Sequence, residues 1–213
     1  MKFNSFQLKW IAIITMVIDH VGAVLFPHQM IFRIIGRISF PIFCFLLVEG
    51  FFHTSNVKKY IVRLGVFALL SEVPYDLAFR GSFVDIHKQN VFFALLIGLV
   101  MMYAITYTNN MTVKVIYLVL AMWAARMIAC DYGYKGILLI AVYYFFRDRL
   151  LVKTFLGAFW NFLGGISLQM YGALASVPIM LYNGERGKGM KYIFYVFYPV
   201  HLLILYFISS ILI

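Results

Sequence analysis

Charged side chains are scarce in this sequence. Asp, Glu, Lys and Arg make up 12% of its 213 residues, whereas 64% of the residues are hydrophobic. Soluble domains carry roughly 25% charged and at most about 50% apolar residues, so a soluble fold is excluded. The mean hydropathy of +0.91 and apolar runs of roughly 20 residues, long enough to cross a bilayer, predict an all-α, polytopic membrane protein. We expect a single domain over residues 1–213.

Cysteine and acidic residues are also few. Cys44 and Cys130 each lie in or beside an apolar run, which excludes a disulfide framework and gives no metal-ligand spacing. We therefore expect ordinary buried cysteines and no metal site. Eight acids against eighteen Lys and Arg give a net charge of +10. In a membrane protein this excess is explained by basic cytoplasmic loops, so nucleic acid is not an expected partner.

Short polar loops divide the apolar runs into nine expected helices. The first is not expected to be a cleaved signal peptide, because it contains Asp19 and His20 and lacks a small-residue cleavage site. The region 152–182 is either one long broken helix or two spans divided at Gly164-Gly165. We expect eight to nine transmembrane helices, with ten as a further alternative, around a polar cavity. The nine helices are predicted at 10–26, 31–52, 60–79, 90–107, 113–129, 133–146, 152–166, 168–182 and 191–212.

The distribution of Lys and Arg favours nine spans with the amino terminus in the cytoplasm. With nine spans, twelve of the eighteen basic residues fall inside and five outside, and Arg37 lies within a span. With eight spans the bias disappears, whereas cytoplasmic loops normally hold the excess. The inner residues are Lys2, Lys9, Lys58, Lys59, Arg63, Lys114, Arg147, Arg149, Lys153, Arg186, Lys188 and Lys191, and the outer ones are Arg33, Arg80, Lys88, Arg126 and Lys135.

Several ionisable side chains lie inside the predicted spans, where each costs free energy unless it faces a cavity or a partner. Those of the first three spans fall at a similar depth, which predicts a shared polar cavity in the outer half of the protein. Glu49, nearer the inner side, is expected to reach the interface. The residues expected at the cavity are Asp19, His20, Arg33, Arg37, Glu72 and Asp76, with Asn90 at the start of the fourth span.

Two interpretations of this group remain open. Arg33 and Arg37 are four residues apart and share a helix face, as do Glu72 and Asp76. The arginines and acids could therefore neutralise one another across the bundle, with Arg37 pairing with Glu72 or Asp76. Alternatively, they surround a reaction site.

His20 is the candidate general base, because an imidazole exchanges a proton near neutral pH. Asp19 could orient its ring, but adjacent helical residues diverge by about 100°, so Asp19 could instead bind a neighbouring helix. His201 shares a helix face with Tyr198 and is either a second proton-handling group or a hydrogen-bonded structural residue.

The inner loops contain two basic stretches, FRDRLLVK (146–153) and YNGERGKGMK (182–191). Basic side chains and glycine backbone N–H groups near helix ends bind phosphate, although positive-inside anchoring explains any single residue equally well. As a group they suit a phosphorylated donor. The candidate donor-binding residues are Lys9, Arg147, Arg149, Lys153, Asn183, Arg186, Lys188, Tyr198 and His201.

Five ordered motifs resemble the TraX family, whose name-giving member is associated with N-terminal acetylation of conjugative pilin. The motifs are LKWIAIITMVIDHVGAVLFP, FRIIGRISFPIFCFLLVEGF, KYIVRLGVFALLSEVPYDLAF, QNVFFALLIGL, and LYNGERG with KYIFYVFYPVHLLIL. The family looks related to the membrane acyltransferase-3 group, which transfers acyl groups from cytoplasmic acyl-CoA to acceptors on the far side. That group has a basic residue, ten residues, then a catalytic histidine in its first span. Lys9 and His20 have this spacing, although arginine is the usual basic residue.

The resemblance implies an acetyltransferase that uses acetyl-CoA and acts on a peptide N-terminus or another envelope amine or hydroxyl. His20 would be the base, Arg33 or Arg37 with Asn90 would stabilise the oxyanion, and Glu72 and Asp76 would orient the arginines or attract an amine. Two alternatives remain open: a proton-coupled transporter of small solutes, and a non-catalytic scaffold.

Overall fold

The computed structural model describes residues 2–162, 167–189 and 191–212, and over these residues the fold is helical, without strands. This confirms the all-α prediction. Each of the nine predicted segments contains helix, although the second and third are each divided in two. Gly164-Gly165 lies outside the described residues. The elements are α1 (Ser5–Val24), α2 (Met30–Gly36), α3 (Ser39–His53), α4 (Val57–Leu70), α5 (Glu72–Arg80), α6 (Val91–Ile105), α7 (Met111–Met127), α8 (Gly133–Phe145), α9 (Leu150–Trp160), the 3₁₀ helix η1 (Leu168–Ala175), α10 (Ser176–Met180) and α11 (Lys191–Leu212).

The two divided segments are each interrupted just before a proline. α2 ends before Arg37, four residues ahead of Pro41, and α4 ends before Ser71, three residues ahead of Pro74. Proline has no N–H to bond the preceding turn and its ring crowds that turn, so the helix is interrupted there and restarts with proline in its first turn. Both breaks lie in the segments that carry the predicted cavity residues.

Asparagine begins four of the helices. The side chains of Asn4, Asn56, Asn90 and Asn110 each accept a hydrogen bond from a backbone N–H of the first turn of α1, α4, α6 and α7. At Asn4 the bond is reciprocated by Gln7, which completes a capping box. Such caps satisfy N–H groups that have no partner within the helix. The local sequence therefore fixes where these helices start.

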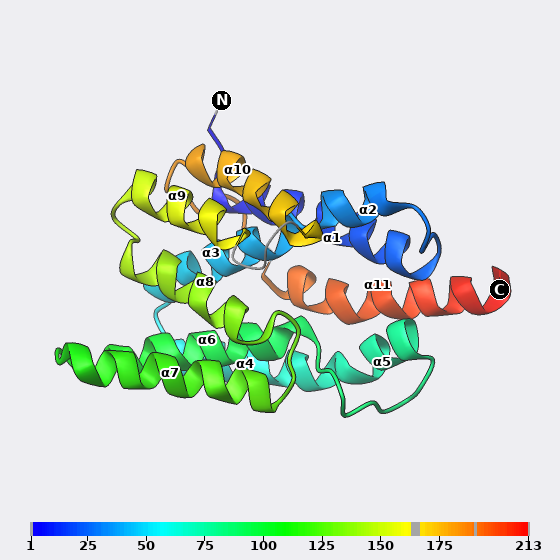
Figure 1. The fold of residues 1–213 in the computed structure, drawn as a ribbon, viewed down its shortest axis with the longest axis horizontal. Helices are drawn as coiled ribbons and strands as arrows, with labels where there is room; N and C mark the ends of the chain where they lie inside the picture. Colours follow the sequence, from blue (N-terminus) through cyan, green and yellow to red (C-terminus); the bar gives the residue numbers. More distant parts are fainter. Residues whose placement is uncertain (1, 163–166, 190, 213) are drawn as a thin grey trace.

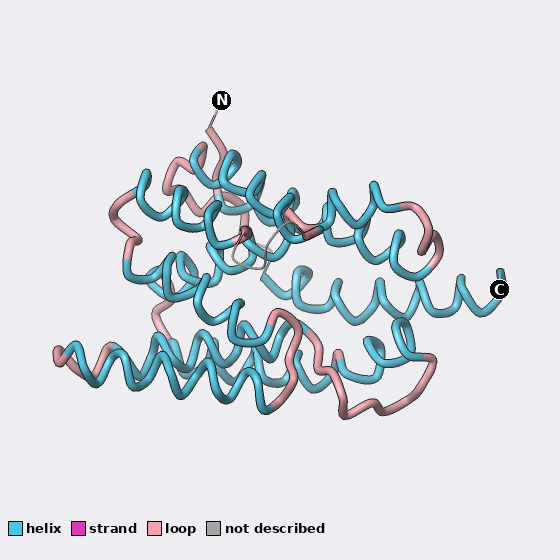
Figure 2. The backbone as a smooth tube through the Cα atoms, in the orientation of Figure 1, coloured by secondary structure: helices cyan, strands magenta, loops and turns pink. Residues whose placement is uncertain are grey.

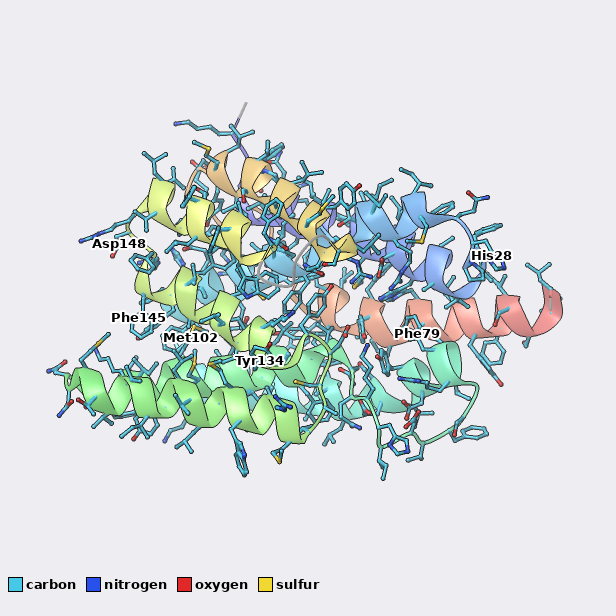
Figure 3. The ribbon with its side chains drawn as sticks, in the orientation of Figure 1. His28, Phe79, Met102, Tyr134, Phe145 and Asp148 are labelled. Atoms are coloured by element: carbon cyan, nitrogen blue, oxygen red, sulfur yellow. The ribbon has the colours of Figure 1, made fainter. Side chains whose placement is uncertain are left out.

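The helices run roughly along the long axis of the molecule, and successive passes alternate in direction (Figure 1). The loops gather toward two ends (Figure 2). We call the end with loops 54–56, 106–110, 146–149 and 181–189 the amino end, and the other, with loops 25–29 and 81–89, the distal end. Asp148 marks the amino end and His28 the distal end in Figure 3.

Backbone hydrogen bonds join distant loops at both ends. At the amino end, Phe3 donates to Leu181 O and its own carbonyl accepts from Asn183 N, both at 2.8 Å. Toward the distal end, Gln89 donates to Ala129 O at 3.2 Å and its carbonyl accepts from Asp131 N at 2.9 Å. The first pair holds the start of α1 against the loop before α11, and the second holds loop 81–89 against the α7–α8 turn.

Within the part of the chain that the structure describes, three helices are long and apolar enough to cross a membrane by length and composition: Ser5–Val24, Met30–His53 (α2 and α3 together) and Tyr192–Leu212. The other apolar helices are shorter, with 15 residues in α6 and 13 in α8. At 1.5 Å per residue, these span about 20–22 Å, less than the roughly 30 Å of a hydrocarbon core. The eight to nine spans therefore remain a prediction.

Close contact between α1 and α2 depends on two glycines. A Cβ at Gly22 would collide with the Phe32 side chain, and a Cβ at Gly36 would collide with the side chain of Asp19. Gly36 is buried, so the space that a larger residue would need is already filled by the carboxylate. These glycines allow α2 to approach α1 closely enough for Asp19 to meet the arginines of that segment.

We predict that Gly36→Ala lowers the unfolding midpoint in detergent, because overpacking a filled site costs roughly 1–3 kcal/mol. The matched control is Gly65→Ala in α4, where the new Cβ would lie 3.7 Å from Leu96 Cδ2, an ordinary contact. There the gain in helix propensity is about 0.5–1 kcal/mol. Equal midpoints for the two variants would contradict the packing described here.

Candidate functional site: a histidine cavity and a basic cleft

Four of the predicted cavity residues lie together around a cavity of about 300 Å³, which we call the histidine cavity. α1 contributes Asp19 and His20, and the α2–α3 segment contributes Arg33 and Arg37. The remaining walls come from α5, α11 and the two joined distal loops, including Tyr75, Phe79, Arg80, Lys88, Asp131, Tyr132 and Tyr198. The predicted shared cavity is therefore present, with these four residues in its wall.

Asp19 pairs with both arginines. Arg33 Nη1 donates to Asp19 Oδ2 at 2.9 Å and also contacts the Asp19 carbonyl at 3.2 Å. Arg37 Nη2 lies 3.5 Å from Asp19 Oδ1. The side chain of Asp19 is 15% exposed, that of Arg37 16% and that of Arg33 27%. One carboxylate is thus the counter-ion of two partly buried guanidinium groups.

This pairing corrects two of the alternatives drawn from the sequence. Arg37 was considered as a partner of Glu72 or Asp76, but within the described chain its acidic partner is Asp19. Asp19 was also considered as the group that orients His20, whereas its carboxylate is bonded to the arginines. The physical reason is the direction of adjacent helical side chains, which differ by about 100° and therefore face different neighbours.

His20 is instead hydrogen-bonded to His201. His20 Nδ1 lies 2.7 Å from His201 Nε2, and His201 Nδ1 lies 2.8 Å from the carbonyl oxygen of Phe197. The two rings are within 4° of parallel, with centroids 5.0 Å apart. A 2.7 Å bond between two ring nitrogens cannot hold the ring centroids much farther apart than this. The bond therefore points along the line between the two centroids and lies close to both ring planes. The three groups form a linear chain from α1 into α11.

The chain fixes the tautomer of each neutral imidazole. A carbonyl oxygen only accepts, so His201 Nδ1 carries a hydrogen and donates to Phe197. His201 Nε2 is then an acceptor, and His20 Nδ1 donates to it. This leaves the Nε2 lone pair of His20 without a hydrogen and able to take a proton. His201 therefore orients His20, the role for which Asp19 had been considered.

Aromatic rings enclose the histidine pair. Phe79 and Tyr198 approach the His20 ring with centroids at 5.3 and 6.0 Å and interplanar angles of 79° and 67°. Tyr198 and His201 are buried, at 4% and 6% exposure. Figure 3 shows Phe79 on the side of α5 that faces α11. These rings restrict the orientation of His20 and reduce its access to solvent.

Glu72, Asp76 and Asn90 do not line the histidine cavity. Glu72 Oε1 accepts from the backbone N–H of Asn90 at 2.9 Å and also from its side-chain amide. Asn90 is fully buried and donates to Ala68 O at 2.8 Å. Asp76, 2% exposed, accepts from Asp85 N at 2.8 Å. The expectation that they act with the arginines is therefore wrong in geometry; they join the α4–α5 break to the start of α6 and hold loop 81–89.

A second, larger cavity of about 450 Å³ opens toward the amino end, and we call it the basic cleft. Its lining includes Lys9 from α1, Lys59 and Arg63 from α4, and Arg186 from the loop before α11. The aromatic rings of Tyr60 and Tyr195 lie 5.3 and 5.2 Å from the Arg63 guanidinium carbon. The cleft thus combines cationic groups with apolar and aromatic walls.

Only two of the predicted donor-binding residues line this cleft, Lys9 and Arg186. Arg147 pairs with Glu49 at 3.4 Å, Lys153 donates to Arg147 O at 2.9 Å, and Arg149 is exposed. Asn183 and Lys188 are exposed on the loop before α11 and do not line the cleft, and Tyr198 and His201 lie beside His20. Sequence position alone grouped residues that the fold separates.

Lys59 and Arg63 were counted among the inner basic residues but were not predicted to bind the donor. They lie four residues apart near the start of α4, a spacing that places both on one helix face. That periodicity, applied to the basic residues rather than to the apolar ones, was the signal that could have found them. Among the described residues, no group of His, Cys, Asp and Glu suits a metal ion.

The two cavities share a lining residue, Phe43. This side chain of α3 lines both of them, whereas Lys9 and His20 lie on α1, in the wall of one cavity each. His20 lies eleven positions after Lys9 along this helix, which corresponds to about 16 Å. α1 therefore runs past both cavities, with a basic residue at one and the histidine at the other.

We predict that Asp19→Asn destabilises the protein strongly, because it leaves two partly buried guanidinium groups without a counter-charge. Removing one partner of a buried ion pair costs on the order of 3 kcal/mol. Asp131→Asn is the control, since Asp131 pairs with Lys88 at 3.0 Å where the side chains are 32% and 43% exposed. Midpoints of thermal unfolding in detergent measure both, and a smaller loss for Asp19→Asn than for Asp131→Asn would contradict the prediction.

Comparison with known proteins gives relatives in bacteria. A probable fimbrial assembly protein of Dichelobacter nodosus, FimC of serogroup H1, is 29% identical over 95% of this chain and 94% of its own length. An uncharacterised protein of Rickettsia prowazekii (strain Madrid E) is 46% identical over 28% of this chain and 23% of its own. No solved structure matches. The family described as TraX protein matches residues 5–209, and the chain therefore belongs to the TraX protein family.

Proposed function

We propose that this protein is a membrane acetyltransferase that takes an acetyl group from cytoplasmic acetyl-CoA and transfers it to an amine or hydroxyl at the opposite face. The observation that carries the proposal is the free Nε2 lone pair of His20, set by the chain through His201 to Phe197 O. A positioned neutral imidazole in a cavity is suited to general-base catalysis. The cationic side chains beside it suit a reaction that develops negative charge.

The arrangement of the helices supports an integral membrane protein with nine passes. Successive helical passes alternate in direction along the long axis (Figure 1). Large apolar side chains are exposed on many of them, including Val62, Leu69, Trp123, Phe155 and Phe207, as expected for surfaces that contact lipid. The loops of the amino end carry Arg147, Arg149, Arg186 and Lys188, and at the same end Lys2 precedes α1 and Lys58 lies in the first turn of α4. By the positive-inside rule this end would lie in the cytoplasm of the bacterium, across the inner membrane.

The basic cleft is the proposed donor site. Its volume of about 450 Å³ is within the range of roughly 300–1,000 Å³ for small-molecule sites. Lys9, Lys59, Arg63 and Arg186 would bind the phosphate groups of acetyl-CoA through charge-assisted hydrogen bonds. The apolar residues nearer Phe43 would accommodate the less polar arm that ends in the thioester. These residues fit the donor, and acetyl-CoA would supply the acetyl group as that thioester.

His20 would act on the acceptor. Its Nε2 takes the proton of the attacking N–H or O–H while the acceptor's lone pair bonds to the carbonyl carbon. When the carbon–sulfur bond breaks, that proton passes to the sulfur. Amine or alcohol plus acetyl-CoA thus gives amide or ester plus the CoA thiol. His201 Nε2 accepts from His20 Nδ1 throughout, which stabilises the imidazolium that forms.

Arg33 and Arg37 are the proposed electrostatic partners of the developing oxyanion, since both line the histidine cavity. Asn90 is omitted from this role because it is buried against Glu72 and Ala68. We extend the proposal to a relationship with the membrane acyltransferase-3 group, supported by the placement of Lys9 and His20 at the two cavities. The name of the Dichelobacter relative refers to fimbrial assembly, which supports a pilus-related peptide as one acceptor.

We predict that His20→Gln lowers acetyl transfer by roughly 10²–10⁴-fold, the contribution of a positioned base. Glutamine can still donate to His201 Nε2, so the fold and donor binding should be retained, but it cannot accept the proton. The measurement is transfer of radiolabelled acetyl by protein in liposomes, with thermal unfolding as the folding control. Turnover at the wild-type rate would remove His20 from the mechanism.

We also predict that acetyl-CoA raises the unfolding midpoint of the wild type, because a ligand that binds the folded state stabilises it. Arg63→Gln should weaken this effect, with a loss of roughly tenfold in affinity for one charged contact. Arg149→Gln is the matched control, as Arg149 is exposed and does not line the cleft. No stabilisation by acetyl-CoA, together with proton-dependent solute uptake, would favour transport instead.

A further inference from the structure

The histidine cavity has more positive than negative charge. Four cationic side chains line it: Arg33, Arg37, Arg80 and Lys88. Three carboxylates pair with them: Lys88 is 3.0 Å from Asp131, Arg80 is 3.5 Å from Asp85, and Asp19 serves both Arg33 and Arg37. One positive charge is therefore left without a counter-charge, and it belongs to the Arg33–Arg37 pair.

No other acid in the described chain compensates this charge. Glu72 and Asp76 are bonded to Asn90 and to the backbone of Asp85, and neither lines the cavity. Glu49 lines the basic cleft and pairs with Arg147. Carbonyl oxygens of Asp19 and Arg33 accept from the guanidinium groups, but a carbonyl has no net charge. Among the described residues, the cavity therefore carries one positive charge that no carboxylate neutralises.

An uncompensated guanidinium at 16% side-chain exposure is costly to the folded state. Arg37 is also held weakly, since the two hydrogen bonds that its side chain donates to the described residues are 3.4 and 3.5 Å long. Most of its N–H donors therefore remain available to a ligand. A planar guanidinium with free donors binds carboxylate and phosphate groups well, often through two bonds at once.

We infer that the acceptor carries an oxyanion, a carboxylate or phosphate, close to the amine or hydroxyl that is acetylated, and that Arg37, assisted by Arg33, binds it. This inference rests on the proposed function, because it names the substrate class of the same site. The oxyanion neutralises the excess charge when it binds, and it places the nucleophile near His20, which lines the same cavity. A cationic acceptor without an anionic group is disfavoured by the field of the cavity.

The test compares acceptors that differ in this one group. Glycerol 3-phosphate is paired with glycerol, and β-alanine with β-alaninamide, so that the two pairs separate phosphate from carboxylate recognition. Binding is measured as the shift in unfolding midpoint of purified protein in detergent, and transfer as kcat/KM with acetyl-CoA. We expect the charged member of at least one pair to bind and react at least about tenfold better, the gain of one charge-assisted contact.

Arg37→Gln is the informative variant, because it leaves Asp19 paired with Arg33 and removes the excess charge without leaving an unpaired group. It should fold with an unchanged or higher unfolding midpoint, and the preference for the charged acceptor should disappear. Arg126→Gln, the same substitution at an exposed residue of α7 outside the cavity, should retain the preference.

The outcomes separate this inference from the proposed function. Acetylation of neutral acceptors as well as of charged ones, or a preference that survives in Arg37→Gln, overturns the inference and leaves acetyl transfer intact. A drop in kcat for Arg37→Gln with unchanged acceptor preference also overturns it, since the charge would then serve only the transition state. Binding of the charged members without transfer to any acceptor supports the oxyanion site and counts against acetyl transfer. If no acceptor binds and none is acetylated, the inference is overturned.

Discussion

The shared carboxylate of Asp19 is the interaction on which the histidine cavity depends. It joins α1 to the α2–α3 segment through two guanidinium groups, and it occupies the space that Gly36 leaves empty. The break before Pro41 ends α2 at Gly36, with Arg37 as its C-cap and Arg33 in its last turn, so both arginines lie at the end of a short helix, where the helix dipole favours cations. Backbone interruption, glycine packing and charge pairing thus operate together at one point.

A second part of the cavity wall is organised by hydrogen bonds between neutral groups. His20 and His201 come from helices at opposite ends of the sequence, and the carbonyl of Phe197 determines which nitrogen of each ring carries hydrogen. The charged wall and the neutral wall are adjacent on α1, because Asp19 and His20 are neighbours that face different helices. One turn of helix therefore presents a fixed counter-charge on one side and a proton acceptor on the other.

The sequence was informative where a local rule applies. Hydropathy predicted the helical segments, and the intramembrane charges predicted a shared cavity. The asparagines that begin helices and the prolines that follow the two breaks are local signals of the same kind, although they were not used in the prediction. Pairings across the bundle were less accessible. Glu72 and Asp76 have the same helix-face spacing as the arginines, yet the break at Ser71 turns α5 so that Glu72 meets Asn90. The basic loop residues likewise gave no indication that Arg147 would form an ion pair with Glu49, which lies ninety-eight positions away in the sequence. Which side chains pair across the bundle depends on the relative placement of the helices, and the periodicity of the sequence does not determine that placement.

The position of Phe43 has a consequence for the membrane itself. This aromatic ring lines both cavities, so in the proposed reaction it would lie between the donor and the acceptor. An enzyme of the proposed kind has to pass only a two-carbon fragment past that ring, while the nucleotide stays behind and the electrical seal of the bilayer is kept. In such an enzyme the aromatic ring of Phe43, rather than the relative position of whole domains, would determine whether the two compartments are joined during the reaction.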